Sequence, residues 1–185
     1  ANAVVDAGLI FIGPKASSME AMGTKTCARQ VMSKANVPVV PGVKEPVKDE
    51  IDAKNIAKSV GYPVMLKAVA GGGGKGMRKV DSEEDFISAF RMAQSEARNS
   101  FGNDEIYIEK FLNKPRHIEM QILADMHGNV EAFVERECSV QRRHQKVLEE
   151  SPSLFVDPDM RERMAEVAKK AALAVDYVGA GTIEF

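Results

Sequence analysis

Residues 67–80 read KAVAGGGGKGMRKV, a run of glycines between two short segments that each have the character of a β-strand. The stretch contains basic residues and no acidic one. Consecutive glycines let the backbone approach a ligand closely and turn its N–H groups toward an anion, and Lys67 and Lys75 add charge suited to phosphate. The segment therefore predicts a loop that covers a polyphosphate, although a solvated hairpin would have the same pattern.

Three known glycine-rich motifs do not fit this loop. Gly71, Gly73 and Gly76 match the spacing of a dinucleotide-binding fingerprint, but a strand rather than a helix is expected after them. A P-loop needs Ser or Thr after its Gly-Lys pair, where this chain has Gly76. A protein kinase would carry His-Arg-Asp and Asp-Phe-Gly motifs downstream, and the sequence has neither.

A second basic segment, residues 137–146, reads ECSVQRRHQK. In an extended strand Arg142, His144 and Lys146 would share one face, where they could hold a phosphate and a small oxyanion together. The same residues would also suit a solvated basic loop. Aromatic residues are lacking nearby, so a nucleic-acid surface is the less favoured interpretation.

Composition and charge exclude several classes of protein. The 185 residues carry 25 Lys and Arg against 27 Asp and Glu, a formal charge of −2, which excludes a uniformly basic nucleic-acid binder. No apolar run approaches the roughly 20 residues that span a bilayer. The two cysteines are far apart and form no CxxC pair, so neither a disulfide framework nor a structural zinc site is expected.

The hydrophobic pattern predicts an α/β (α+β) chain with two lobes. Helices are expected at about 17–35, 49–60, from 82 through 93, and 157–175. Strands are expected at 9–12, 63–68, 76–80, 106–111, 117–124, 130–136 and 181–185, whereas 140–149 reads as less regular. The chain begins without Met and stops within a strand-like segment, so we expect it to be an internal piece of a longer polypeptide.

Four single residues each have two interpretations. Lys25 could contact a phosphate or lie on the surface of its helix, and Glu109 could accept from a ribose hydroxyl or pair with a cation. His117 could be a ligand-binding residue or a polar residue of its strand. Glu184 could ligate Mg²⁺, which prefers oxygen donors, or face outward from its strand.

Taken together, these motifs resemble the middle of a biotin carboxylase, a member of the ATP-grasp group. The resemblance extends over the whole chain, and the ECSVQRRHQK segment is its most specific part. It rests on FIGPK at 11–15, MGTK at 22–25, GYPV at 61–64, KA at 67–68, GGGGKGM at 71–77, PRHIE at 115–119, ECSVQRRHQK at 137–146 and GAGT at 179–182.

The resemblance implies a role for each matching residue. Lys25 and Lys67 would hold the ATP phosphates, and Gly73 and Gly74 would belong to a lid that closes over them. Lys146 would bind bicarbonate, and Glu184 would be the first acidic ligand of Mg²⁺ or Mn²⁺. The remaining residues implied to contact the nucleotide are Glu109, Lys110, Phe111 and Leu112 at a hinge beside adenine and ribose, together with His117, Gln141 and His144.

The resemblance also implies a fold and a reaction. An ATP-grasp fold would place the end of an N-terminal domain and a connecting helix at 1–40, a lid subdomain at 41–112, and the first half of the second lobe at 113–185. The implied chemistry is phosphoryl transfer from MgATP to bicarbonate, giving carboxyphosphate, followed by carboxylation of biotin. Lid closure would keep water from this labile intermediate.

Implied partners are a biotin carboxyl carrier protein or domain, a carboxyltransferase, and a second copy of the parent in a homodimer; neither nucleic acid nor a membrane is expected. The parent would be an acetyl-, propionyl- or pyruvate-type carboxylase in the cytoplasm, or in the mitochondrial matrix of a eukaryote.

The chain departs from the family pattern at Lys75, a position where the family often has Arg. The family's other metal ligands, bicarbonate-binding Arg and catalytic base would lie beyond residue 185, so the isolated chain is expected to be inactive.

Two other functions remain open at this point. Another ATP-grasp ligase, such as carbamoyl-phosphate synthetase, shares the bicarbonate step, but residues 142–146 argue against it. A module that binds nucleotide without turnover would keep the ATP contacts alone.

Overall fold

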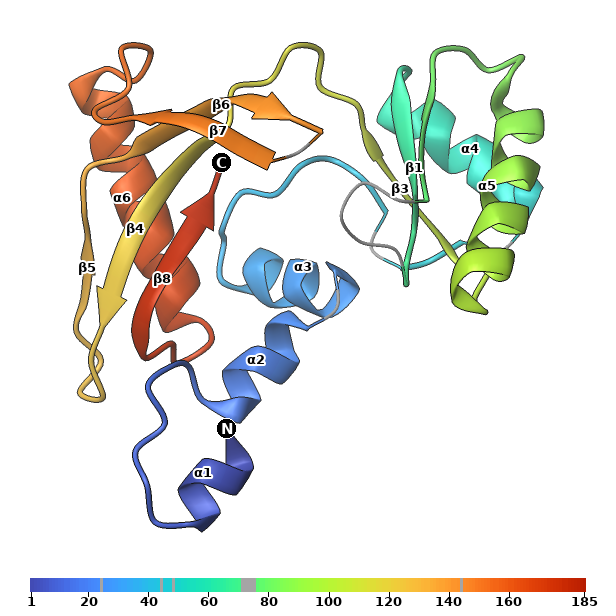
Figure 1. Ribbon diagram of the computed structural model, residues 1–185. Coiled ribbons are helices and arrows are strands. Elements are labelled where there is room, and N and C mark those ends of the chain that lie inside the picture. Colours follow the sequence, from blue (N-terminus) through green and yellow to red (C-terminus); the bar gives the residue numbers. More distant parts are fainter. Residues whose placement is uncertain (24, 44, 48, 71–75, 144) are drawn as a thin grey trace. The chain divides into compact units, whose positions relative to one another are not determined.

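The computed structural model describes residues 1–23, 25–43, 45–47, 49–70, 76–143 and 145–185, including all side chains except those of Lys25 and Thr26. These residues form two compact units: Ala1–Pro38 with Pro115–Phe185 is unit 1, and Val39–Lys114 is unit 2. The helices, labelled in Figure 1, are α1 (Asn2–Asp6), α2 (Ala16–Met22), α3 (Lys25–Lys34), α4 (Glu50–Val60), α5 (Phe86–Phe101) and α6 (Pro158–Leu173). The strands are β1 (Val64–Ala68), β2 (Met77–Val80), β3 (Ile106–Lys110), β4 (Ile118–Ala124), β5 (Val130–Ala132), β6 (Arg136–Arg142), β7 (Gln145–Glu150) and β8 (Gly179–Glu184).

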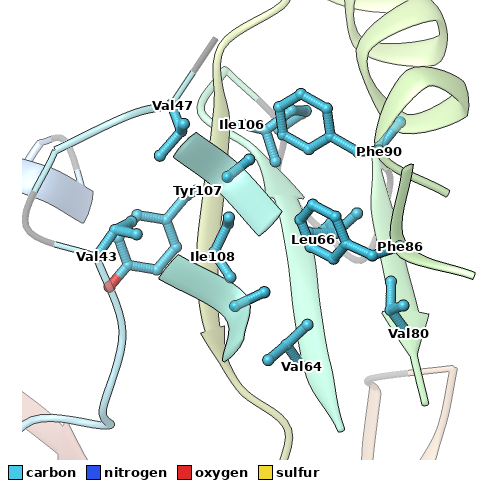
Figure 2. Close-up of a cluster of buried hydrophobic side chains, with 14 of the residues drawn as sticks. Val43, Val47, Val64, Leu66, Val80, Phe86, Phe90, Ile106, Tyr107 and Ile108 are labelled. Atoms are coloured by element: carbon cyan, nitrogen blue, oxygen red, sulfur yellow. The ribbon is translucent and has the colours of Figure 1, made fainter. Parts of the chain in front are cut away.

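Unit 2 is built on a three-stranded antiparallel sheet with the order β2-β1-β3. Alternation along β1 buries Val64, Leu66 and Ala68 on one face, as the period of two in a strand requires. Phe86 and Phe90 of α5 belong to the same buried cluster, shown in Figure 2, and their rings stack with centroids 5.8 Å apart. Apolar burial against the two helices α4 and α5 therefore holds this sheet together.

Short local signals mark the ends of the helices in unit 2. The side chain of Asp49 accepts hydrogen bonds from the backbone N–H groups of Ile51 and Asp52, both at 2.9 Å, and α4 begins there. Gly102 ends α5 in the left-handed conformation, with φ of 71°, which glycine adopts without strain. The helix predicted from 49 is therefore confirmed, whereas the helix predicted from 82 begins at Phe86 and reaches Phe101.

Unit 1 is built on a five-stranded sheet in which β4 is the central strand. On one edge β4 pairs with β5 at residues 122–124 and with β6 at residues 118–119, and on the other edge it pairs with β8. Strand β7 continues from β6 as an antiparallel hairpin. Figure 1 shows this hairpin (orange) at one end of β4 and β8 (red) beside β4.

The core of unit 1 lies between this sheet and α6. Met120 and Ile122 of β4 pack against Ala168 and Ala172 of α6, whose small side chains let the helix approach the strand closely. A second cluster joins Met32 and Val37 to Ala171 on α6. Residues 1–38 and 115–185 thus form one compact unit. The assignment of 1–40 to the end of an N-terminal domain and a connecting helix stays a prediction.

Two predictions for the first 35 residues are wrong. Residues 9–12 are not a strand, and Leu9, Ile10 and Ile12 are 64%, 90% and 96% exposed. A strand forms only beside a neighbour that accepts its backbone hydrogen bonds, and none of the described strands pairs with this segment. The single helix expected at 17–35 is two helices, because α2 ends at Met22 before Gly23, a poor helix former.

The segment 130–149 also differs from its prediction. The strand expected at 130–136 is interrupted, since β5 ends at Ala132 and β6 begins at Arg136. Residues 140–149, expected to be irregular, lie largely in the β6–β7 hairpin. Because most side chains of β7 are exposed, this strand lacks the alternation of apolar and polar residues by which a strand is recognised in a sequence.

The predicted domain boundaries at 40/41 and 112/113 fall close to the unit boundaries at 38/39 and 114/115. The interpretation of unit 2 as a nucleotide lid stays a prediction. No helix in the described part of the chain is both long and apolar enough to cross a membrane.

Candidate functional site

A cluster of ionisable side chains gathers where β4 meets β6 and β8. Glu119 on β4 lies directly opposite Arg136 on β6 and, on the other edge, directly opposite Glu184 on β8. His117 precedes β4, and Lys146 reaches the same place from β7. We call His117, Glu119, Arg136, Lys146 and Glu184 the Glu119 cluster.

Glu119 is the centre of this cluster and is only 3% exposed. Arg136 donates from Nε to Oε1 of Glu119 at 2.7 Å, and Lys146 donates to Oε2. Burial would raise the pKa of Glu119, but the hydrogen bonds from Lys146 and Arg136 outweigh it, so the pKa lies below its usual value. Glu119 is therefore an anion that holds two cations in defined positions.

Lys146 links the two carboxylates of the cluster. Its Nζ donates to Glu119 and lies 3.0 Å from Oε1 of Glu184. Hydrogen bonds to Glu119 and Glu184 outweigh burial and raise the pKa of Lys146 well above its usual value. Lys146 is therefore a protonated ammonium at neutral pH, which suits the anion-binding role predicted for it.

His117 lies beside both carboxylates. Its Nε2 is 3.4 Å from Oε1 of Glu184 and 3.7 Å from Oε2 of Glu119. This nitrogen is buried and makes no hydrogen bond among the residues that the structure describes. A buried polar atom without a partner is costly, so His117 is a position at which a bound ligand would add a contact.

The cluster can be tested against the Mg²⁺ predicted for Glu184. His117, Glu119 and Glu184 each offer a ligand atom, and these atoms lie within 4.8 Å of one another. Both oxygens of Glu119 are already held by Arg136 and Lys146. Glu184, whose side chain is 58% exposed, is therefore the carboxylate best placed to bind a hard cation, and it fits as one oxygen ligand of such an ion.

Gln141 lies opposite Lys146 in the β6–β7 hairpin. Its Nε2 donates to the backbone carbonyl of Cys138 at 2.8 Å, and its side chain is half-buried. The hairpin, which the sequence did not predict, thus brings Gln141 and Lys146 together as a directly opposed cross-strand pair. His144 lies outside the described residues, and so does the side chain of Lys25.

Unit 2 contains a second predicted group. Lys67 on β1 and Glu109 on β3 form an ion pair, and their side chains are 19% and 18% exposed. The pair joins the first lysine of the glycine-rich segment to the first residue of the predicted hinge. Gly73 and Gly74 lie outside the described residues.

The other hinge residues make contacts within unit 2. Lys110 donates from Nζ to the carbonyls of Gly61 and Tyr62 at 2.7 and 2.9 Å, so its side chain anchors the start of β1. The ring of Phe111 lies under Nζ of Lys79, 4.9 Å from the ring centroid. Leu112 is 48% exposed.

The structure thus groups the predicted residues by unit. His117, Gln141, Lys146 and Glu184 belong to unit 1, and Lys67 and Glu109–Leu112 belong to unit 2. Glu119 and Arg136 were not predicted as site residues, although Glu119 belongs to the PRHIE motif at 115–119. The available signal is an acidic residue two positions from His117 in a mainly apolar strand, because side chains two apart share a face.

Comparison with known proteins identifies the family of this chain. Residues 24–185 match the family described as carbamoyl-phosphate synthase L chain, ATP binding domain. The chain is 52% identical to a biotin carboxylase of Nostoc sp. over 185 residues, covering 100% of this chain and 41% of that protein. It is also 48% identical to biotin carboxylase 1 of Bacillus subtilis over 180 residues, covering 97% of this chain and 40% of that protein.

Solved structures agree with the sequence relatives. A biotin carboxylase complex with β-γ-ATP from Campylobacter jejuni superposes with a TM-score of 0.90 at 48% identity, covering 100% of this chain and 41% of that one. The biotin carboxylase domain of Hydrogenobacter thermophilus 2-oxoglutarate carboxylase, solved with MgADP, ADP and bicarbonate, gives a TM-score of 0.89 at 45% identity. The superposition covers 100% of this chain and 41% of that one.

The chain therefore spans about two fifths of the length of these relatives. The family's description names carbamoyl-phosphate synthase, while the relatives and structures above are carboxylases. The predicted resemblance and the predicted fold class are both confirmed. The chain belongs to the family of the carbamoyl-phosphate synthase L chain ATP-binding domain, and it has the fold of ATP-grasp biotin carboxylase domains.

Proposed function

We propose that this chain is part of a biotin carboxylase and carries a large share of its nucleotide and bicarbonate sites. The observation that carries the proposal is Lys146, an ammonium held between Glu119 and Glu184 beside His117. A fixed cation of this kind is suited to a small oxyanion. The relatives at 45–52% identity include a biotin carboxylase domain whose structure holds MgADP and bicarbonate.

In this proposal each group of residues has a separate task. Lys25 and Lys67 hold the phosphates of ATP, and Gly73 and Gly74 close over them. Glu109, Lys110, Phe111 and Leu112 lie against adenine and ribose, while His117, Gln141 and His144 add contacts on the nucleotide side. Lys146 holds bicarbonate, and Glu184 supplies a ligand to Mg²⁺ or Mn²⁺, which would offset phosphate charge.

The proposed reaction has two steps. An oxygen of bicarbonate attacks the γ-phosphorus of ATP, the bond from that phosphorus to the ADP oxygen breaks, and carboxyphosphate and ADP result. The carboxyl group is then transferred to the ring nitrogen of biotin, which loses its proton, and inorganic phosphate leaves. Phosphoryl transfer is accelerated mainly by positioning and by positive charge around the transferred group, which the lysines supply.

The proposed partners follow from the relatives. They include the alpha chains of a methylcrotonoyl-CoA carboxylase from Rattus norvegicus and of a propionyl-CoA carboxylase from Ruegeria pomeroyi. We infer from such names a biotin carrier and a carboxyltransferase as partners of the parent protein. The homodimer is supported by the Hydrogenobacter thermophilus domain, described as a dimer. The cytoplasmic location stays a prediction.

The experiment is an assay of ATP cleavage by the full-length protein that contains this chain, in the presence of Mg²⁺, with bicarbonate, free biotin and ammonia each added or left out. We expect cleavage that depends on bicarbonate and biotin, and Lys146→Gln should reduce it by about 10²-fold or more, as removal of a transition-state contact does. Lys169→Gln is the matched control, since Lys169 is similarly exposed but its partner Glu131 is 3.9 Å away at the surface.

Two outcomes would contradict the proposal. ATP cleavage that depends on bicarbonate and ammonia but not on biotin would indicate the carbamoyl-phosphate type of ligase. ATP binding with no cleavage under any of these conditions would indicate a module that binds nucleotide without turnover.

A further inference from the structure

The β6–β7 hairpin, which carries Gln141 and Lys146, has little apolar packing of its own. Val140 on β6 and Val147 and Leu148 on β7 are 56%, 64% and 53% exposed. The pairing of the two strands is also irregular between Glu137 and Gln141. Beyond Cys138, which is buried at the start of β6, apolar packing therefore does little to fix the direction in which this hairpin leaves the sheet.

Two buried carboxylates lie at the root of the hairpin. Glu135 and Glu137 are 0% and 5% exposed and flank the first residue of β6. Ser153 connects them, because its backbone N–H donates to Oε1 of Glu135 at 3.1 Å and its hydroxyl donates to Oε2 of Glu137 at 2.5 Å. Ser153 is itself 3% exposed, so both bonds are shielded from water.

Each carboxylate is also held by an arginine from another element. Arg161, in the first turns of α6, donates to both oxygens of Glu135 at 2.6 and 2.7 Å. Arg116, just before β4, donates to Glu137. The buried groups Glu135, Ser153 and Glu137 are thus held at both ends by arginines, half-buried Arg161 and exposed Arg116. This network ties the root of β6 to α6 on one side and to the start of β4 on the other.

The hydrogen bonds of this network hold the root of the hairpin rigidly. Hydrogen bonds from charged donors are stronger than neutral ones, and a satisfied buried network fixes the orientation of the groups it joins. The hydroxyl of Ser153 is the largest contribution that keeps the pKa of Glu137 below its usual value. Removing that hydroxyl would leave an oxygen of a buried carboxylate without its nearest donor.

We propose that Ser153, Glu135 and Glu137 are positioning residues for Lys146. They fix the root of the β6–β7 hairpin and so keep the Lys146 ammonium between Glu119 and Glu184. The proposal rests on the function proposed above, in which Lys146 holds bicarbonate. It assigns to these residues no contact with substrate.

The test uses Ser153→Ala in the full-length protein, with Ser18→Ala as the matched control. Ser18 is also 3% exposed in unit 1, and its hydroxyl donates to the carbonyl of Asp176 at 3.4 Å, away from the hairpin. Both substitutions remove one buried hydroxyl. If Ser153→Ala does not fold, Glu137→Gln replaces it, since the amide keeps the shape of the side chain and removes the charge that Arg116 and Ser153 bind.

The first measurement is the rate at which an amine-reactive acylating reagent modifies Lys146, read by mass spectrometry. Ser153→Ala should raise this rate about tenfold, the effect of losing one charge-assisted hydrogen bond, while Ser18→Ala leaves it unchanged. The second measurement is kinetic. The KM for bicarbonate should rise about tenfold in Ser153→Ala, and the KM for ATP should stay within about twofold.

The outcomes separate this proposal from the proposed function. Equal effects of Ser153→Ala and Ser18→Ala on both measurements would overturn the positioning role, as would equal increases in the two KM values. A wild-type protein without bicarbonate-dependent ATP cleavage would overturn the proposed function instead. The acylation rate of Lys146 would still decide whether the network positions this lysine.

Discussion

Glu119 and Glu184 lie directly opposite each other on the antiparallel strands β4 and β8, and they differ sharply in exposure. The side chain of Glu119 is 4% exposed, whereas that of Glu184 is 58% exposed. Like charges in directly opposed positions destabilise a strand pair, and the ammonium of Lys146 between them offsets this repulsion. Both oxygens of buried Glu119 thus accept hydrogen bonds from Arg136 and Lys146, whereas exposed Glu184 can also bind a metal ion.

Replacing Glu119 with Gln should destabilise unit 1. The substitution leaves Arg136 and Lys146 without a buried counter-charge, and breaking a buried ion pair costs about 3 kcal/mol. Hydrogen exchange of the β4 amides would report this as a lower free energy of opening. Glu149→Gln is the control, because the side chain of Glu149 is 46% exposed and lies 3.7 Å from Arg136. Equal exchange in the two variants would contradict the central role of Glu119.

Replacing Lys67 with Ala should weaken ATP binding to the full-length protein by about 1.5–3 kcal/mol, the value of a charge-assisted contact. Lys67 lies within β1 and is therefore fixed by the sheet, so its loss should matter more than that of Lys75, which lies outside the described residues. Isothermal titration with ATP would measure the difference. Lys54→Ala is the control in the same unit, since its 3.4 Å pair with Glu83 is at the surface. Unchanged affinity for Lys67→Ala would refute the assignment.

Replacing Glu184 with Gln should weaken binding of Mn²⁺ in the presence of ADP by about tenfold, because a hard cation loses a charged oxygen ligand. The paramagnetic resonance signal of free Mn²⁺ gives the affinity without any turnover. Glu131→Gln is the control, since the side chain of Glu131 is 76% exposed and lies far along the sheet, on β5. A similar small change in both variants would show that Glu184 is not a metal ligand.

Most elements with a strong local signal were predictable from the sequence. Helix α4 has its cap at Asp49, β1 alternates between buried and half-buried residues, and α6 begins with Asp157 and Pro158, the first of which caps the helix. In each case the residues that determine the helix or strand lie within a few positions of one another. The local sequence was therefore sufficient to predict these elements.

The sequence predictions fail where a local structure depends on residues far away in the chain. The apolar residues 9–12 have the composition of a strand, but pairing depends on a neighbour that the local sequence does not reveal. The β6–β7 hairpin is mostly exposed, and its root is held by Arg161 and Ser153, which lie after it in the chain. Glu119 was missed for the same reason, since Arg136 and Lys146 meet it only through the sheet.

The last prediction concerns the acid sensitivity of unit 1. Hydrogen bonds from Arg161 outweigh burial and hold the pKa of Glu135 below its usual value. A folded-state pKa below the unfolded value of about 4.3 contributes stability that is fully present above this pH and is lost as pH falls through the folded pKa. Glu135→Gln removes this contribution at every pH.

The variant should therefore be less stable than the wild type by about 3 kcal/mol at pH 7, the cost of breaking a buried pair. The difference should shrink as pH falls below about 4.3, because the wild-type carboxylate then becomes protonated and loses its charge in turn. Hydrogen exchange of the β6 and α6 amides, corrected for the intrinsic rate at each pH, measures the free energy of opening in both proteins. Glu162→Gln, on the same helix turn but exposed, should show no such convergence. A difference between wild type and Glu135→Gln that stays constant from pH 7 to strongly acidic conditions would mean that charge on Glu135 does not stabilise the fold.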